Sequence, residues 1–365
     1  MKLIDKYIFK QVALATFIGL IAFLVVWISP EILFKIIKKA IDGQISGYIA
    51  LKLFFLEIPE ILSNIIPATL MLGSLWAFDR LSKDSELTIF RGIGISFRRL
   101  AVPVLSLSII GAFACFVITN YLVPYSQSSL KVLKQNVYRD YFVFLDRTKE
   151  GKPDHILIIG DYDGKNARNI KFFSFSEKVS DEAPLIKSII TAQAAVYKNN
   201  TWSALDGMEY EIAPDGVYKN IKRFKNTDIL KSNSAKNAYD LLSYSLKKTK
   251  QMKIKELSEY VSLLKTLDMQ TEYRYMLNKL YQRFSQPFSC ILFSLCGIIL
   301  GFSKPREKKF LGFTIGIALI FLCMIIVPFA DMLAQIGVLP PIIAAWIPSL
   351  IIITAIWALL KYKKI

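Results

Sequence analysis

The sequence contains a single histidine, and this shortage limits the chemistry that the protein can perform. His155 begins an alternating apolar segment and has no cysteine near it, so we interpret it as a strand-edge residue rather than a metal ligand. One histidine also cannot supply a Ser-His-Asp set with its orienting groups. We therefore expect no catalytic residues, no metal and no cofactor in this chain.

Cysteine is scarce as well, and its distribution excludes a disulfide in the polar part of the chain. The four cysteines all lie inside apolar runs, and none lies in the polar middle region. That region therefore has no disulfide, whichever side of a membrane it occupies. We interpret Cys115, Cys290, Cys296 and Cys323 as small buried apolar side chains.

A nucleotide-binding loop is also missing. The segment "GDYDGK" at 160–165 has glycines too close together for a phosphate-binding loop, and Asn166 stands where a hydroxyl would hold magnesium. A hairpin turn is the better interpretation.

No charged residue lies at the centre of a clear apolar run, where an ion-coupled carrier often has one. Any work that the protein performs is therefore expected to be driven by a partner.

Long apolar runs dominate the 365 residues, of which 53% are hydrophobic. Six runs are close to the roughly 20 residues that a helix needs to cross a bilayer. The net charge of +17 could suggest nucleic acid, but many basic residues flank these runs as topology anchors, so we expect no nucleic-acid partner. The predicted spans are about 8–29, 58–78, 99–123, 284–303, 311–333 and 339–360.

The basic residues predict the orientation of these spans, because short cytoplasmic loops are enriched in lysine and arginine. With six spans, four basic clusters fall on one side, so both termini are predicted to be cytoplasmic and residues 124–280 to lie outside. The clusters are Lys2, Lys6 and Lys10; Arg80, Lys83, Arg91, Arg98 and Arg99; Lys304, Arg306, Lys308 and Lys309; and Lys361, Lys363 and Lys364. A further group, Lys35, Lys38 and Lys39, falls at the outer end of the first span, against this rule.

The outer region has two parts. Residues 153–230 combine short apolar or alternating segments with Asn-Asn, Asp-Gly and Pro-Asp-Gly turns, which predict an antiparallel β-domain. Apolar residues then recur at helical spacing from Ile254 to Leu264. We predict transmembrane helices over 1–123, a β-domain over 124–252, a helical connector over 253–283 and three further spans over 284–365.

The charged stretch "DRLSKDSELTIFRGIGIS", residues 79–96, is cytoplasmic in this topology. A short amphipathic helix is predicted at about 82–93, with Ser82 or Asp84 as its N-cap, Glu86 in the first turn and glycines at its end. Such a helix suits a groove on a soluble protein. A helix lying on lipid headgroups fits the periodicity equally well.

Several segments, taken in order, resemble one family. Ser85, Glu86, Leu87, Gly92 and Gly94 fit the coupling helix of the YjgP/YjgQ permeases, the LptF/LptG proteins of the lipopolysaccharide exporter. Four other segments also resemble this family. They are "IDKYIFK" at the start, "ITAQAAVYKNNTWSALDG" in the outer region, "LYQRFSQPFSCILFSLCGIILG" before and within the fourth span and "GVLPPIIAAWIPSL" near the end. The resemblance covers nearly the whole chain.

This resemblance implies an inner-membrane permease subunit that pairs with a sister permease or with itself. A cytoplasmic ABC ATPase dimer would bind the coupling helices and hydrolyse ATP, and a periplasmic β-jellyroll-like domain would pass lipopolysaccharide to a bridge protein with a jellyroll of its own. The coupling residues would be Arg80, Ser85, Glu86, Leu87, Phe90 and Gly92. The alternatives are a mechanotransmission protein or a membrane-anchored interaction protein, neither of which transports lipid.

The misplaced lysines match a basic cluster of the LptG-type partner. Lys35, Lys38 and Lys39, with Arg283 as a weaker candidate, would then hold phosphates or acidic sugars of the lipid. The alternative is that the lysines only extend to the membrane interface.

Overall fold

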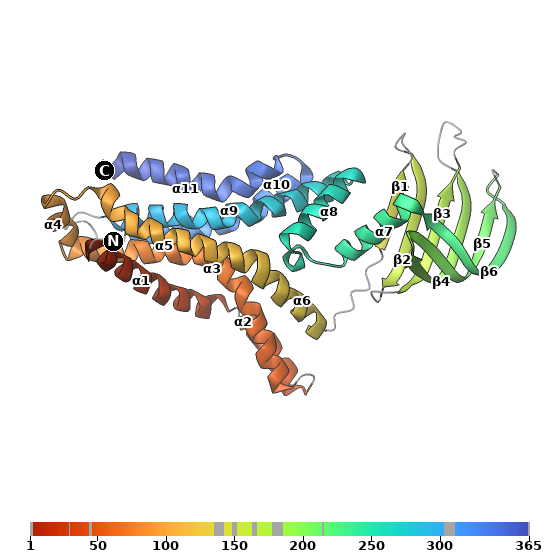
Figure 1. The fold of residues 1–365 in the computed structure, drawn as a ribbon, viewed down its shortest axis with the longest axis horizontal. Coiled ribbons are helices and arrows are strands. Elements are labelled where there is room, and N and C mark those ends of the chain that lie inside the picture. Colours follow the sequence, from red (N-terminus) through yellow and green to blue (C-terminus); the bar gives the residue numbers. More distant parts are fainter. Residues whose placement is uncertain are drawn as a thin grey trace. The chain divides into compact units, whose positions relative to one another are not determined.

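The computed structural model describes residues 3–28, 30–43, 46–134, 142–147, 152–162, 166–176, 185–213, 215–302 and 311–363. The chain divides into two compact units. The helical unit comprises residues 1–135, 249–261 and 270–365, and the sheet unit comprises 136–248 and 262–269. Figure 1 shows the helices of the first and the strands of the second.

The helical unit contains the long apolar helices. Its elements are α1 (Leu3–Trp27), α2 (Pro30–Ile41), α3 (Gly47–Lys83), α4 (Glu86–Gly92), α5 (Phe97–Val117), the π-helical turn η1 (Ile118–Leu122), α6 (Val123–Lys134), the 3-10 turn η2 (Thr249–Gln251), α9 (Gln270–Gly301), α10 (Leu311–Ile336) and α11 (Pro341–Lys363). α8 (Ile254–Thr266) continues from this unit into the other.

Five helical segments are long and apolar enough to cross a membrane. They are Leu3–Trp27, Phe97–Lys131, Gln270–Gly301, Gly312–Ile336 and Pro341–Lys361. α3 contains the predicted span at 58–78 but is not among the five, so the described helices do not by themselves establish three spans on each side of the insert. Much of α3 from Ile61 to Ser82 is buried against other helices, which explains how it includes polar residues.

α3 and α9 pack closely because small residues line their contact. A Cβ added at Gly297 would lie 2.3 Å from the Met71 carbonyl oxygen, and one at Gly301 would lie 2.5 Å from that of Leu75. Only glycine allows such an approach of two backbones. Further along the same contact, the hydroxyls of Ser74 and Ser294 lie 3.3 Å apart.

The sheet unit is built on one six-stranded antiparallel sheet whose strands follow chain order. The strands are β1 (Phe142–Arg147), β2 (Pro153–Tyr162), β3 (Asn166–Phe175), β4 (Ile186–Lys198), β5 (Thr201–Ile212) and β6 (Tyr218–Lys231). The predicted antiparallel strands are confirmed. The family resemblance implied a jellyroll-like domain, whereas the described strands form a meander without the crossovers between two sheets that a jellyroll has.

The Asn-Asn turn predicted from the sequence joins β4 to β5. Asn199 and Asn200 both have positive φ, at 49° and 57°, as a two-residue hairpin turn requires. After β6, a helix that the sequence analysis did not predict, α7 (Ser232–Ser245), packs against the sheet. Trp202 is fully buried there, and its indole N–H donates to the Ala235 carbonyl at 3.1 Å.

Candidate functional site

The charged stretch at 79–96 folds as the end of α3, the helix α4 and the loop leading into α5. α3 continues past Ser82, whose hydroxyl donates to a carbonyl of α9 at 3.3 Å. Asp84 is the C-cap of α3, and Ser85 is the N-cap of α4, with φ 60° and no side-chain capping bond. α4 therefore begins at Glu86, and neither of the predicted N-cap residues caps it, because α3 extends further than expected.

The C-terminal end of α4 is closed by two backbone hydrogen bonds. The Gly94 N–H donates to the Arg91 carbonyl and the Ile95 N–H to the Phe90 carbonyl, both at 3.0 Å, which is a Schellman motif. Gly94 has φ +86°, so a glycine is favoured there. Gly92 is the last residue of α4, and a Cβ added to it would meet nothing within 4 Å.

Two polar contacts connect the N-terminal part of α1 to this stretch. The Tyr7 hydroxyl donates to Oε1 of the half-buried Glu86 at 3.0 Å. The Arg99 guanidinium of α5 pairs with Asp5 at 2.7 Å, and the Asp5 side chain is only 8% exposed. Neither α1 residue was predicted to belong to this site, although their signal is present in "IDKYIFK", where polar residues interrupt an otherwise apolar segment.

The apolar residues of α4 and of its C-cap, Ile93, divide between the core and the surface. Leu87 is 2% exposed within a core cluster of α1, α3, α5 and α9, and Phe90 packs against the same cluster. Ile89 and Ile93 are 61% and 67% exposed. Leu87 and Phe90 therefore anchor α4 to its own chain, while the two isoleucines present an apolar surface.

The basic residues of the stretch have local partners. Arg80 pairs with Asp84 at 3.6 Å, one helical turn away, and both side chains are more than half exposed. The Arg91 guanidinium lies 5.5 Å from the ring centroid of Phe302. Exposed pairs of this kind contribute little stability, so these side chains can exchange partners at small cost.

A cavity of about 490 Å³ lies within the helical unit. Its walls come from α1, α3, η1, the start of α6, α9, α10 and α11 and from the segment that begins at Thr249. One part of the lining is apolar, including Phe23, Ile65, Phe293 and Val327. Another part is polar and includes Glu60, Asn64, Lys250, Lys279, Gln282, Arg283 and Gln286. This lining suits a molecule with both apolar and polar parts.

Three charged side chains of the cavity lining, Glu60, Lys250 and Lys279, have ion-pair partners. Glu60 accepts hydrogen bonds from Lys250 and, at 2.6 Å, from Gln127. Asp331 accepts hydrogen bonds from three side chains of α9. The donors are Lys279 at 2.5 Å, Asn278 at 2.7 Å and Gln282 at 2.7 Å.

Arg283 lies in the cavity wall but is 6% exposed, and its guanidinium is well supplied with acceptors. Nη1 donates to the Thr119 carbonyl at 3.0 Å and to the Asn120 side chain at 3.3 Å. Nη2 donates to the carbonyls of Thr249 and Met252, both at 2.8 Å. This side chain therefore holds η1, η2 and α9 together, and a headgroup role would compete with those bonds.

The lysine group predicted to hold headgroups lies on α2. Lys38 is exposed, whereas the side chains of Lys35 and Lys39 lie outside the described part of the structure. α2 packs through Ile36, which is 8% exposed and joins a cluster with Leu53 and Leu130. The predicted cytoplasmic cluster at 304–309 and residues 163–165 of the "GDYDGK" segment also lie outside the described residues.

Residues 6–362 match the family described as lipopolysaccharide export system permease LptF/LptG. The lipopolysaccharide export system permease protein LptF of Escherichia coli (strain K12) is 26% identical over 124 residues, which is 34% of this chain and 34% of that protein. LptF of Shigella flexneri matches with the same values, so the match spans about a third of the length of these curated relatives.

Proposed function

Because the chain belongs to the LptF/LptG family of lipopolysaccharide export system permeases, we propose that it is one permease subunit of a transporter that extracts lipopolysaccharide from the inner membrane. ATP would be hydrolysed on a separate cytoplasmic ATPase dimer, and a sister permease or a second copy would complete the channel. The observation that carries this proposal is the family match over residues 6–362 together with the amphipathic cavity in the helical unit.

The proposed topology has six spans. They are α1, α3, α5 continued through α6, α9, α10 and α11, with α3 as an inner helix covered by its neighbours. In Figure 1 both termini and α4 lie at one end of the helical unit, which supports their location on one side of the membrane, the cytoplasmic side. The sheet unit would then be periplasmic.

The proposed contact with the ATPase is α4. Glu86 is half-buried and uses Oε1 for Tyr7, so Oε2 can accept from a basic side chain of the ATPase. The exposed Ile89 and Ile93 would fill an apolar groove beside it. Leu87 and Phe90, predicted as apolar contacts, would instead connect α4 firmly to the helices around the cavity.

The proposed lipid site is the cavity. Its apolar wall suits acyl chains and its polar part suits the sugar-phosphate region, a division that a purely mechanical transmission protein would not need. Lys38, whose side chain is exposed on α2, would bind headgroup phosphates together with the other two lysines predicted for this role, Lys35 and Lys39.

Transfer out of the membrane would proceed through the sheet unit. β1 and β6 are the two edge strands of the sheet, each bonded to one neighbour among the described strands. An edge strand can pair with a strand of another domain. We assign this contact to the periplasmic bridge protein.

The test is co-purification of the cytoplasmic ATPase with the native protein and with Glu86→Arg in mild detergent. We expect the native protein to retain the ATPase and the variant to lose it, because the reversed charge would repel the basic partner. Asp84→Arg is the matched control, since Asp84 lies two residues away, pairs only weakly with Arg80 and belongs to the end of α3. Equal retention by the native protein and the Glu86 variant would refute this contact.

A further inference from the structure

Two segments of the helical unit carry the chain out to the sheet unit and back. The helical unit runs without interruption to residue 135, just after α6, and resumes at Thr249, where the turn η2 begins. Residues 136–248, which form most of the sheet unit, lie between these two points. A side chain that binds both α6 and η2 therefore holds both ends of this insert.

Glu60 of α3 binds both segments with one carboxylate. Its Oε1 accepts a hydrogen bond from Lys250 of η2, and the two side chains form an ion pair. Its Oε2 accepts a hydrogen bond from the side-chain amide of Gln127 in α6 at 2.6 Å. The side-chain amide of Gln251, next to Lys250, donates to the main-chain carbonyl of Gln127 at 3.2 Å. These four residues form a closed ring across α3, α6 and η2, which we name the Glu60 latch.

Arg283 supports the same return segment but has a different character. Its Nη2 donates to the main-chain carbonyls of Thr249 and Met252, both at 2.8 Å, and the residue is only 6% exposed. The Lys250 side chain is 61% exposed and that of Glu60 is 22% exposed. Because Lys250 is open to its surroundings, its ammonium group can change partner, whereas the buried guanidinium of Arg283 is a fixed support.

The Glu60 latch is part of the cavity wall, since both Glu60 and Lys250 line the cavity. The cations in the described lining are Lys250, Lys279 and Arg283, and the Lys279 side chain is 23% exposed in its pair with Asp331. Lys250 is therefore the most accessible of the three. A phosphate or carboxylate on a ligand offers Lys250 the same kind of charge-assisted hydrogen bond that Glu60 does. An anionic group in the cavity can therefore compete with Glu60.

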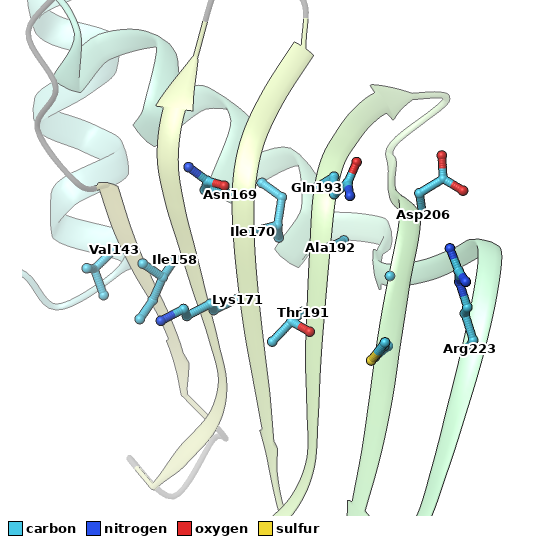
Figure 2. A pocket seen from close by; sticks show the side chains of 12 residues that line it. Val143, Ile158, Asn169, Ile170, Lys171, Thr191, Ala192, Gln193, Asp206 and Arg223 are labelled. Atoms are coloured by element: carbon cyan, nitrogen blue, oxygen red, sulfur yellow. The ribbon is translucent and has the colours of Figure 1, made fainter.

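Such an ion pair does not form wherever charged residues line a hollow. The sheet has a hollow of about 880 Å³ on one face, where Figure 2 shows Lys171, Asp206 and Arg223 on three different strands. Within the described part of the chain, these three side chains form no ion pair with one another. In the cavity wall, by contrast, the fold pairs Glu60 with Lys250 across 190 positions of sequence.

We infer that Glu60 is a positioning residue that keeps α6 and η2 on the cavity wall until an anionic ligand replaces it on Lys250. A partly exposed ion pair contributes little stability, so this exchange of partners is energetically accessible. Opening the Glu60 latch loosens both ends of the 136–248 insert, and the filling of the cavity is thereby signalled to the segments that carry the sheet unit. That the ligand is the exported lipopolysaccharide rests on the proposed function, whereas the latch needs only an amphiphile with an anionic headgroup.

Amide hydrogen exchange of the full chain in nanodiscs tests the Glu60 latch without the ATPase. In phosphatidylcholine nanodiscs, the amides of α6 and η2 should exchange slowly, and added lipopolysaccharide should raise their exchange rates about two- to fivefold, the change expected from losing a partly exposed ion pair. Glu60→Gln keeps the size of the side chain but not its charge. It should exchange at the faster rate from the start and respond no further to lipopolysaccharide. Lys250→Gln, which removes the other charge, should behave in the same way.

Two further variants separate this role from general support of the fold. Glu211→Gln is the matched control, because it removes the carboxylate of the Lys222–Glu211 ion pair in the sheet, and it should exchange and respond like the native chain. The double variant Glu60→Lys with Lys250→Glu reverses the ion pair and should restore slow exchange, which Glu60→Lys alone should not. A purely steric role for Glu60 would not be rescued by reversing the charges.

Replacing part of the phosphatidylcholine with phosphatidylglycerol shows which anionic headgroups open the Glu60 latch. Faster exchange with either anionic lipid supports the latch. The latch is refuted if neither lipid changes the exchange of the native chain, or if Glu60→Gln exchanges as slowly as the control. Faster exchange with phosphatidylglycerol but none with lipopolysaccharide would count against the proposed function and leave the latch standing, so the two failures are distinguishable.

Discussion

Tyr7 is a residue whose role can be separated from the fold around it. Its hydroxyl donates to Glu86, so Tyr7→Phe should leave the helices intact but release the carboxylate from its position. A single hydrogen bond contributes about 0.5–1.5 kcal/mol, so we expect the ATPase to bind roughly 2–10-fold more weakly. Affinity measurement in detergent tests this. Tyr48→Phe, at a tyrosine that is 75% exposed, is the control and should bind normally.

Arg283 is expected to be a stability residue. Arg283→Lys keeps the positive charge but cannot reach the carbonyls of Thr249 and Met252 together with Thr119. Each hydrogen bond from a charged donor is worth about 1.5–3 kcal/mol, so losing two should lower the free energy of unfolding by about 3 kcal/mol or more. Thermal unfolding in detergent measures the effect. Arg274→Lys, which loses one exposed contact to Ile336, should change little; equal shifts for both variants would contradict the role.

At the scale of elements, the contact between α3 and α9 depends on Gly297. Gly297→Ala would place a Cβ 2.3 Å from the Met71 carbonyl oxygen, so the two helices must separate. Overpacking of this kind costs about 1–3 kcal/mol, seen as a lower unfolding temperature. Gly19→Ala on α1 is the control, because a Cβ there meets nothing within 4 Å, and it should be neutral or slightly stabilising. An unchanged unfolding temperature for Gly297→Ala would show that the contact is loose.

The same elements show how far sequence reasoning extends. Strongly apolar runs and turn residues predicted the long helices, the antiparallel strands and the Asn-Asn hairpin because these depend on local patterns. α7 was missed: its burial depends on Ala235, Ala238, Leu241 and Leu242 facing the sheet, a weak helical pattern in a polar segment. The extent of α3 was also underestimated, since its polar ends are stabilised by neighbouring helices that periodicity does not reveal.

The candidate site was predictable in location but not in detail. The charge pattern identified residues 79–96, yet the sequence does not show that Leu87 is buried while Ile89 and Ile93 are exposed, because that depends on how α4 lies on α1, α3 and α5. Arg283 was predicted as a weaker headgroup-binding candidate because it is a cation beside an apolar run. Its partners come from positions 119, 120, 249 and 252, far away in the chain, so no local pattern could reveal them.

For the whole molecule, the six-span topology makes a prediction about α3. If α3 crosses the membrane, Asp42 before it lies outside and Thr88 after it lies in the cytoplasm. Asp42→Cys should react with an impermeant thiol reagent in intact spheroplasts, and Thr88→Cys only after the membrane is opened. The four native cysteines are buried and should give little background. Identical labelling of both positions would reduce the spans to the five apolar helices and reverse part of the topology.

Photo-crosslinking of lipopolysaccharide to the helical unit in cells would show whether the cavity holds the lipid. A photoreactive phenylalanine would replace Phe293, which lines the cavity and is 6% exposed, or, as the control, Phe113, which is 70% exposed on α5. We expect a lipopolysaccharide adduct at position 293 well above that at 113, because the cavity holds the lipid whereas position 113 faces the bulk of the membrane or a partner. Equal adducts at both positions, or none at 293, would contradict the claim that this cavity carries the lipid.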